Sequence, residues 1–395
     1  MKSILKKIFA GLTALTLMLA VSFSGAAAAA ASAIYSASEL FTNRDLSQTA
    51  DLSDAVYYTL SDGQDIHITA AGVYVLTGTA ANATVYVEAG KDDKVQLVLE
   101  SANVTNGSFP VIYAKTADKV FVTVSGDSQL SVTGAFAADG STNTDGVIFS
   151  KCDLVLNGTA ALTIVSSANG IVGKDDLKIT GGVYNITASS KAIQANDSIR
   201  IADGTLNLTA GTDGLHAENE DDTSLGYIYI GGGTLDIQVG DDGIHATSVV
   251  QIDGGVITIR ASEGIEGTYV QLNGGAVSIQ ASDDGINAAQ KSRSYTATIE
   301  INGGDITVAM GAGDTDAIDS NGNIIVNGGT VSVSGSSAFD YDGSAQYNGG
   351  TLIVNGQQVS AITSQMMGGG RGGMMNSGWG NTQYGNGGFG GGRRW

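Results

Sequence analysis

Apolar residues recur in pairs two positions apart along residues 177–354, and two such pairs bracket each of a series of glycines. One pair ends three residues before the glycine and the next begins two residues after it. Apolar side chains two apart share one face of a strand, so each repeat predicts two short strands with an inward face. The glycine permits a positive φ at the corner between them. These marker glycines are Gly182, Gly204, Gly233, Gly255, Gly275, Gly304, Gly329 and Gly350.

A third short stretch with one inward apolar residue follows most of these pairs. Its apolar residues are Ile193, Leu215, Ile244, Ile265, Ile286, Ile318 and Phe339. Markers spaced 20 to 29 residues apart indicate a solenoid. Two strands and a short third make one coil of an all-β, single-stranded parallel β-helix, with coils stacked about 4.8 Å apart. A propeller blade would need about 40 residues, and the Leu-x-x-Leu-x-Leu pattern of a leucine-rich repeat is missing.

Composition divides the chain into four parts. Residues 1–33 have the charge, apolar run and small-x-small end of a secretory signal peptide, and the short apolar run disfavours a membrane anchor. Residues 34–64 form an N-terminal segment, and residues 65–360 form the β-helix, whose earlier coils begin with the alternation at Ile66. Residues 361–395 form a glycine-rich tail that we expect to be disordered.

The net charge and the cysteine content limit the classes of binding partner and of covalent cross-link that we expect. The formal net charge is −20, which argues against nucleic acid and anionic membranes as partners and suits a protein that binds cations. A single cysteine, Cys152, excludes an intrachain disulfide. We therefore expect a secreted monomer that is extracellular or associated with the cell surface and has no membrane contact after signal cleavage.

Acidic residues repeat at the start of the third stretch, in corner tripeptides that run from Asp145-Gly146-Val147 to Asp316-Ala317-Ile318. A second polar position lies three residues further on. Equivalent positions stack in a solenoid, and carboxylates about 5 Å apart repel unless a cation lies between them. Ca²⁺ takes six to eight oxygen ligands and would resolve this repulsion. The candidate ligands are Asp213, Asp242, Glu263, Glu266, Asp284, Asp316 and Asp319. The alternative is that these acids point outward and keep a rod soluble.

Other side chains are candidates for a carbohydrate ligand. His216 and His245 each follow a corner acid by three residues and stack on neighbouring coils, where they suit a sugar or a metal, or are simply exposed. Three histidines and one cysteine are too few for a typical zinc site. Tyr227 and Tyr269 are candidates for stacking on sugar rings, although tyrosine also commonly fills strands.

Ordered blocks of sequence resemble a known family across residues 64–360. The blocks are Ala71–Thr79, Asp93–Leu99, Ala117–Thr123, Gly173–Gly182, Ser262–Gly267 and the Asp-Gly-Ile corners. They are similar to the secreted bacterial carbohydrate-binding β-helix family that includes a clostridial cellulose- and acid-sugar-binding surface protein. The resemblance implies a right-handed, pectate-lyase-like β-helix with Ca²⁺ between coils, and binding of cellulose and polygalacturonate without cleavage. It implies metal-facing roles for Asp213, Asp242, Glu263, Glu266 and Asp284, whereas Lys191 replaces an expected acid.

Three functions remain open from the sequence. The favoured one is calcium-dependent binding of plant-wall or acidic polysaccharide without cleavage. The second is a calcium-dependent polysaccharide lyase with Lys191 as the base, although Lys191 also suits a simple ion pair with Asp213. A lyase also needs basic residues that hold uronate carboxylates, and residues 204–282 offer only Arg260. The third is a structural envelope or adhesin rod.

Overall fold

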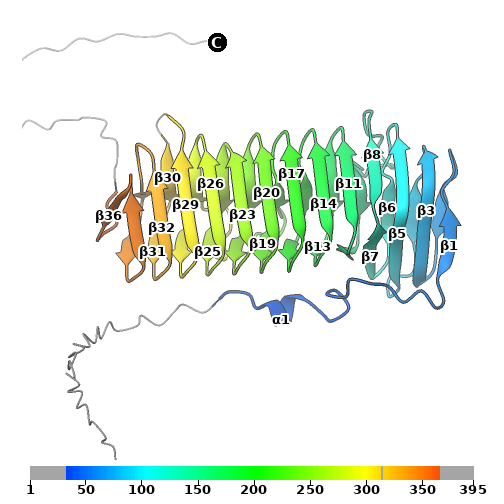
Figure 1. Cartoon of the computed structure of the whole chain (residues 1–395), viewed down its shortest axis with the longest axis horizontal. Coiled ribbons are helices and arrows are strands. Elements are labelled where there is room, and N and C mark those ends of the chain that lie inside the picture. Colours follow the sequence, from blue (N-terminus) through cyan, green and yellow to red (C-terminus); the bar gives the residue numbers. More distant parts are fainter. Residues whose placement is uncertain (1–32, 313–314, 365–395) are drawn as a thin grey trace, which may run out of the picture.

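The computed structural model describes residues 33–312 and 315–364, and these form a rod of stacked coils (Figure 1). The protein is all-β, with one helix of four residues, α1 (Ala37–Leu40), in the described part. Nearly every strand pairs in parallel with the equivalent strand of the next coil, which is a solenoid-like arrangement. The expected signal peptide and most of the glycine-rich tail lie outside the described residues. No helix within the described ranges is long and apolar enough to cross a bilayer.

Each regular coil contributes one strand to each of three ladders. The first ladder contains β1 (Val56–Thr59), β7 (Lys119–Gly126), β10 (Asp153–Gly158), β13 (Asp176–Ile179), β16 (Ser198–Ile201), β19 (Tyr227–Ile230), β22 (Val249–Ile252), β25 (Tyr269–Leu272), β28 (Thr298–Ile301), β31 (Asn323–Val326) and β34 (Ala345–Tyr347). The second contains β8 (Ser128–Val132), β11 (Ala161–Ser166), β14 (Val183–Ala188), β17 (Thr205–Ala210), β20 (Thr234–Val239), β23 (Val256–Ala261), β26 (Ala276–Ala281), β29 (Asp305–Met310), β32 (Thr330–Ser334) and β35 (Thr351–Val354).

The first two ladders form one sheet because β3 (Gly72–Ala81) and β5 (Lys94–Asn106) are long enough to run through both. The last strand, β36 (Gln357–Val359), turns back and pairs antiparallel with β35. The third ladder is a separate sheet. It contains β2 (Ile66–Ile68), β4 (Val85–Glu88), β6 (Ile112–Thr116), β9 (Gly146–Ser150), β12 (Asn169–Gly173), β15 (Ile193–Ala195), β18 (Leu215–Ala217), β21 (Asp242–Ala246), β24 (Glu263–Gly267), β27 (Asp284–Ala288), β30 (Asp316–Ser320) and β33 (Asp340–Tyr341).

The predicted corners and core register are confirmed. All eight marker glycines have a positive φ, and a Cβ on Gly329 would lie 2.6 Å from the carbonyl oxygen of Gly304, so the corner needs glycine. The predicted inward column is in register from coil to coil and is completely buried. It consists of Ile201, Ile230, Ile252, Leu272, Ile301 and Val326. Full burial of each such side chain stabilises the fold by about 1.5–3 kcal/mol.

One corner was aligned wrongly from the sequence. Ile171 pairs with Ile148 and Asn169 pairs with Gly146, so Asp145 lies one residue before the position it was expected to occupy. All five residues of β9 are buried, because its outward side is covered as well as its inward side. Alternation therefore cannot show which of Val147 and Ile148 faces the core.

The N-terminal segment runs lengthwise along the first ladder (Figure 1). Ile34 N donates to Gln271 Oε1, and the Tyr35 ring stacks on Tyr227 with centroids 4.3 Å apart. Further along, Asp45 is fully buried between the ammonium groups of Lys178 and Lys119. The segment thus covers the outer surface of several coils before β1 begins the sheet.

Candidate functional site

Polar side chains on the third ladder form two outward columns. The corner column contains Lys191, Asp213, Asp242, Glu263, Asp284 and Asp316, and the outer column contains Gln194, His216, His245, Glu266, Asn287, Asp319 and Asp340. The outer column is in register through six consecutive strand pairings. The parallel ladder therefore brings residues 21 to 32 positions apart into adjacent layers, about 4.8 Å apart.

The first coils of the corner column are internally neutralised. Lys191 Nζ lies 2.5 Å from Asp213 Oδ2, and His216 Nδ1 lies 2.8 Å from the same oxygen. Burial alone would raise the pKa of Asp213, but the contacts with His216 and Lys191 outweigh burial and hold that pKa well below its usual range. Asp213 therefore already has a cationic partner from the protein, Lys191.

The next coil is neutralised in the same way, partly by a residue outside the ladders. His245 Nδ1 lies 2.6 Å from Asp242 Oδ2 and 2.9 Å from Glu266 Oε2. Lys291, on the loop between β27 and β28, places its Nζ 2.6 Å from Glu266 Oε2. Burial opposes the imidazolium, but hydrogen bonds to Asp242 and Glu266 raise the pKa of His245 to about 9. The repeat pattern gave no sign of Lys291, because it lies in an insertion.

The following coils carry carboxylates without such partners. No lysine, arginine or histidine of the described ranges forms an ion pair with Glu263, Asp284, Asp316 or Asp319. Burial and then the nearby charge of Glu266 raise the pKa of Glu263 to about 7. Burial and neighbouring aspartates raise the pKa of Asp284 to about 6 and that of Asp319 to about 7. The surroundings of these three carboxyl groups therefore disfavour their ionised forms.

The donor set at these coils suits a hard cation. It contains only oxygen ligands, from carboxylates and from Asn287, whose Oδ1 is buried and lacks a hydrogen-bond partner within the described part of the chain. The other amide atom, Asn287 Nδ2, donates to Glu263 Oε2 over 3.3 Å. A calcium ion accepts carboxylate and amide oxygens together and would offset the mutual repulsion.

The tyrosines expected to stack on sugars are not free to do so. Tyr227 is only 7% exposed because Tyr35 lies on it, so the expectation of an exposed ring was wrong. Tyr269 is half-buried; its hydroxyl donates to Glu300 Oε2, and Tyr295 packs against its ring edge. The sequence carries no periodic signal that would place residue 35 on residue 227.

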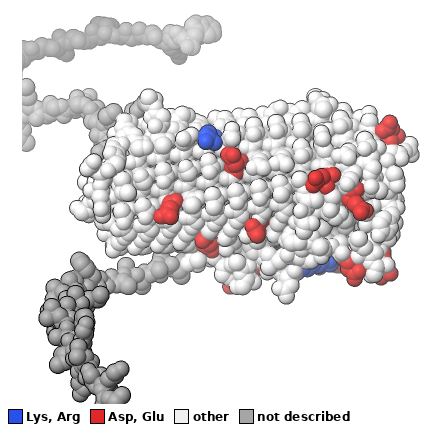
Figure 2. Space-filling view, viewed as in Figure 1, with Lys and Arg blue, Asp and Glu red and all other residues white. Residues whose placement is uncertain are grey.

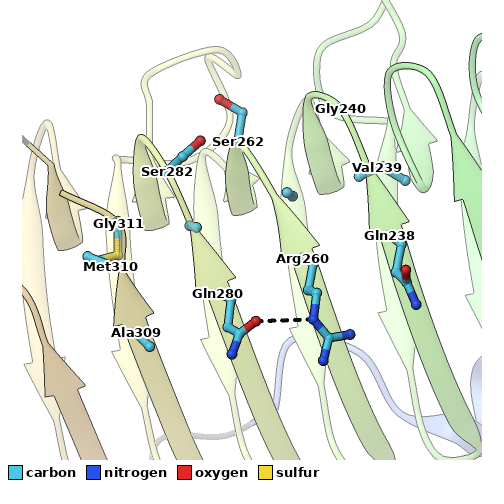
Figure 3. A pocket seen from close by; sticks show the side chains of 12 residues that line it. Gln238, Val239, Gly240, Arg260, Ser262, Gln280, Ser282, Ala309, Met310 and Gly311 are labelled. Carbon is cyan, nitrogen blue, oxygen red and sulfur yellow. Dashed lines mark hydrogen bonds between the residues drawn. The ribbon is translucent and has the colours of Figure 1, made fainter. Parts of the chain in front are cut away.

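A groove lies elsewhere, where the second-ladder strands β20, β23, β26 and β29 end (Figure 3). It has a volume of about 700 Å³, with small apolar side chains on its floor and serine hydroxyls at its edge. Gln238, Arg260 and Gln280 occupy one column of adjacent strands, and Arg260 Nε donates to Gln280 Oε1. The Arg260 side chain is 51% exposed, and its guanidinium lies 4.0 Å from the carboxylate of Asp236. Figure 2 shows that charges are sparse over this face.

Comparisons with known proteins bear on these surfaces. A family model described as carbohydrate-binding domain-containing protein matches residues 62–343. A carbohydrate-binding domain-containing protein of Acetivibrio thermocellus is 33% identical over 129 residues, which is 31% of this chain and 44% of that protein. The chain thus spans less than half the length of that relative. A solved structure of the polysaccharide lyase-like protein from C. thermocellum, a gadolinium derivative, covers 75% of this chain and 96% of its own at 22% identity, with a TM-score of 0.43.

Proposed function

Because the chain belongs to the carbohydrate-binding domain-containing protein family, we propose that it binds plant-wall or acidic polysaccharide, such as cellulose or polygalacturonate, without cleaving it. The proposal includes secretion after loss of residues 1–33, a monomeric extracellular or cell-surface protein, and the right-handed, pectate-lyase-like winding implied by its family resemblance. The observation that carries the site is the groove at the ends of β20, β23, β26 and β29.

The groove has the chemistry that a sugar chain requires. Val239, Ala261, Ala281 and Met310 offer an apolar floor for the apolar faces of sugar rings. Amides and the Arg260 guanidinium line one edge, and a guanidinium binds a uronate carboxylate through two parallel hydrogen bonds. Because the groove crosses four coils at about 4.8 Å each, it has room for a short run of sugar units.

Calcium is the proposed cofactor, held by Glu263, Asp284, Asp316 and Asp319 with Asn287. Asp213, Asp242 and Glu266 also come from the expected ligand set, but protein cations already neutralise them, so we assign them a lesser part. Bound calcium would stabilise this end of the rod and give acidic sugars a cationic contact on an acidic protein.

The geometry around Lys191 supports binding over cleavage. A general base needs a free lone pair to abstract a proton, and Lys191 Nζ is instead held in an ion pair, 2.5 Å from Asp213 Oδ2. The alternative to the lyase hypothesis was a simple ion pair between Lys191 and Asp213, and the two side chains form that ion pair. Lys191 therefore acts as a counter-ion for Asp213.

The test is a binding assay beside a cleavage assay. Untagged mature protein should sediment with insoluble cellulose or calcium-crosslinked polygalacturonate and release no unsaturated uronate. Arg260→Gln should weaken retention on polygalacturonate, whereas Arg293→Gln, which removes an equal charge from the loop between β27 and β28, should not. Sustained uronate release that Lys191→Ala abolishes would establish the lyase instead. If neither the wild type nor any variant were retained on cellulose or on polygalacturonate, the proposed carbohydrate-binding function would be wrong.

A further inference from the structure

Two imidazoles from successive coils lie face to face on the third ladder. His216 and His245 are paired in register, and their ring centroids are 4.5 Å apart with planes 21° from parallel. Both side chains are less than one-tenth exposed. The two rings therefore offer nitrogen atoms from adjacent coils to one small space.

Each ring has one nitrogen engaged by an aspartate three residues earlier. His216 Nδ1 lies 2.8 Å from Asp213 Oδ2, and His245 Nδ1 lies 2.6 Å from Asp242 Oδ2. At His216 the Asp213 carboxylate lies close to Nδ1 without hydrogen-bond geometry. At His245 the contact is a hydrogen bond, and a proton held on Nδ1 leaves the lone pair of Nε2 for a ligand. This is the arrangement by which carboxylates orient histidines that bind metals.

The remaining nitrogen of His216 has an acidic neighbour. His216 Nε2 lies 3.1 Å from Glu218 Oε2, at the start of the loop before β19. One ligand atom from each of His216, Glu218 and His245 falls within 4.8 Å of the other two. Glu218 is 46% exposed, so the group is reached from solvent on one side.

We propose that His216, His245 and Glu218 form a binding site for a divalent transition metal ion of the Zn²⁺ class, with Asp213 and Asp242 as positioning residues. Two imidazoles and one carboxylate leave a fourth position for water or for a ligand oxygen. A second cluster, Asp242, His245 and Glu266, is already joined by short internal contacts and by Lys291. The cluster that contains Glu218 is therefore the one assigned to the metal.

Nitrogen ligands separate this site from the proposed calcium site. Ca²⁺ prefers oxygen ligands, whereas imidazole suits zinc, copper and nickel. Counting histidines in the sequence argued against zinc because only histidine and cysteine were considered as ligands. The fold adds a glutamate from an insertion to two histidines from adjacent coils.

A metal ion at this site would have to displace the ammonium group of Lys291. Lys291 Nζ lies 3.4 Å from His245 Nε2 and is held by Glu266. Lys291 is one-third exposed on a loop, so its ammonium can turn outward when a cation occupies the space beside Nε2. Lys191 is held by Asp213, whose carboxylate also lies beside His216 Nδ1.

The test titrates untagged mature protein with Zn²⁺ by calorimetry, and with Co²⁺ by visible absorption, in the presence of millimolar Ca²⁺. One Zn²⁺ per chain should bind, and Co²⁺ should give the intense bands of a low-coordinate site with nitrogen ligands. His216→Gln and His245→Gln should abolish both signals. Asp242→Asn should weaken Zn²⁺ binding about 10- to 100-fold while leaving the Co²⁺ spectrum recognisable.

Two controls make the outcome decisive. His67→Gln removes the remaining histidine of the same ladder, far from the pair, and should leave Zn²⁺ binding unchanged. Glu218→Gln changes an exposed residue whose loss does not threaten folding, and should weaken Zn²⁺ binding even if the histidine variants fold poorly. Absence of Zn²⁺ binding, full displacement by Ca²⁺, or binding that survives both His216→Gln and Glu218→Gln would overturn the site.

Discussion

The outer column of the third ladder has an aromatic end and an acidic end on one continuous backbone. In the N-terminal coils it consists of Tyr86, Tyr113 and Phe149, in register, with Tyr113 and Phe149 fully buried. In the later coils the same position holds Glu266, Asn287 and Asp319. A spacing of about 4.8 Å brings like side chains together, which favours aromatic rings and opposes carboxylates.

The two ends differ in whether the protein itself supplies partners for their side chains. At the aromatic end, the Tyr113 and Phe149 rings meet edge to face with centroids 5.7 Å apart, and Lys115 lies over the Tyr86 and Tyr113 rings. The Tyr113 hydroxyl donates to Asp139 Oδ2. At the acidic end, burial and the charges of neighbouring carboxylates raise the pKa values of Glu263, Asp284 and Asp319, which have no ion-pair partner in the described ranges. Its stability should therefore depend on cations and pH, whereas that of the aromatic end should not.

The largest expected effect comes from the interior that both ends share. Ile252 is completely buried between Ile230 and Leu272, so Ile252→Asp places an unpaired charge in the core. Such a charge costs several kcal/mol, and we expect no cooperative thermal transition in the variant. Circular dichroism measures this directly. Val256→Asp, at an exposed position four residues on, should fold; equal behaviour of both variants would mean that the register of the core is wrong.

A second prediction concerns the aromatic end. Phe149→Ala should lower the free energy of unfolding by about 3–5 kcal/mol, because it removes a fully buried ring and leaves a cavity. The loss, measured by denaturant titration, should be the same in calcium and in chelator. A loss that calcium restored would show that the two ends are not independent.

A third prediction concerns calcium at the acidic end. Calcium at 100 times its dissociation constant should stabilise the protein by about 2.7 kcal/mol, since it binds only the folded chain. Differential scanning calorimetry should show this rise shrinking in Asp284→Asn, whereas Phe149→Leu should keep it. Identical melting curves in calcium and in excess chelator would remove the calcium proposal. If Asp242→Asn abolished the calcium-induced rise in melting temperature and Asp284→Asn did not change it, the calcium site would lie in the earlier coils.

Much of the fold could be predicted from the sequence, because a solenoid repeats the same local rule in each coil. Paired apolar residues around Gly255 or Gly304 identify strands, corner and inward face together. The rule failed at β9, where Phe149 is buried on the outward side and alternation disappears.

The candidate site was less predictable, because its decisive partners come from outside the repeat. The acidic positions were foreseen, but their states depend on residues that no periodicity places. Lys291 reaches Glu266 from an insertion, Glu218 reaches His216 from another, and Tyr35 covers Tyr227 across nearly two hundred residues of sequence. Local pattern fixes the columns, whereas tertiary contacts decide which acids remain uncompensated.

The smallest predicted effect is a pH dependence of the acidic end. The pKa of Asp319 is raised from 3.8 to about 7 in the folded protein, by burial and by Asp284, so the folded state favours its protonated form. Stability from this preference is complete below the unfolded pKa near 4 and is lost as pH rises through about 7. In chelator, the melting temperature should therefore fall between pH 5 and pH 7.5. Asp213 and Glu266, whose pKa values are lowered, are already ionised throughout this range and do not contribute to the fall.

Asp319→Asn isolates this contribution from that of His245, whose pKa is raised to about 9 and whose stabilisation is also lost as pH rises. The variant keeps the shape of the side chain but cannot ionise, so its melting temperature should fall less than that of the wild type over the same range. A difference of about 1 kcal/mol corresponds to a few degrees in a chain of this size. Calcium should stabilise ionised Asp319 and so reduce the fall in melting temperature of the wild type alone. The pH profiles of the wild type and the variant should therefore become more similar in calcium. Parallel pH profiles of wild type and Asp319→Asn in chelator would show that these carboxylates do not oppose one another, and the acidic end would then need no cation.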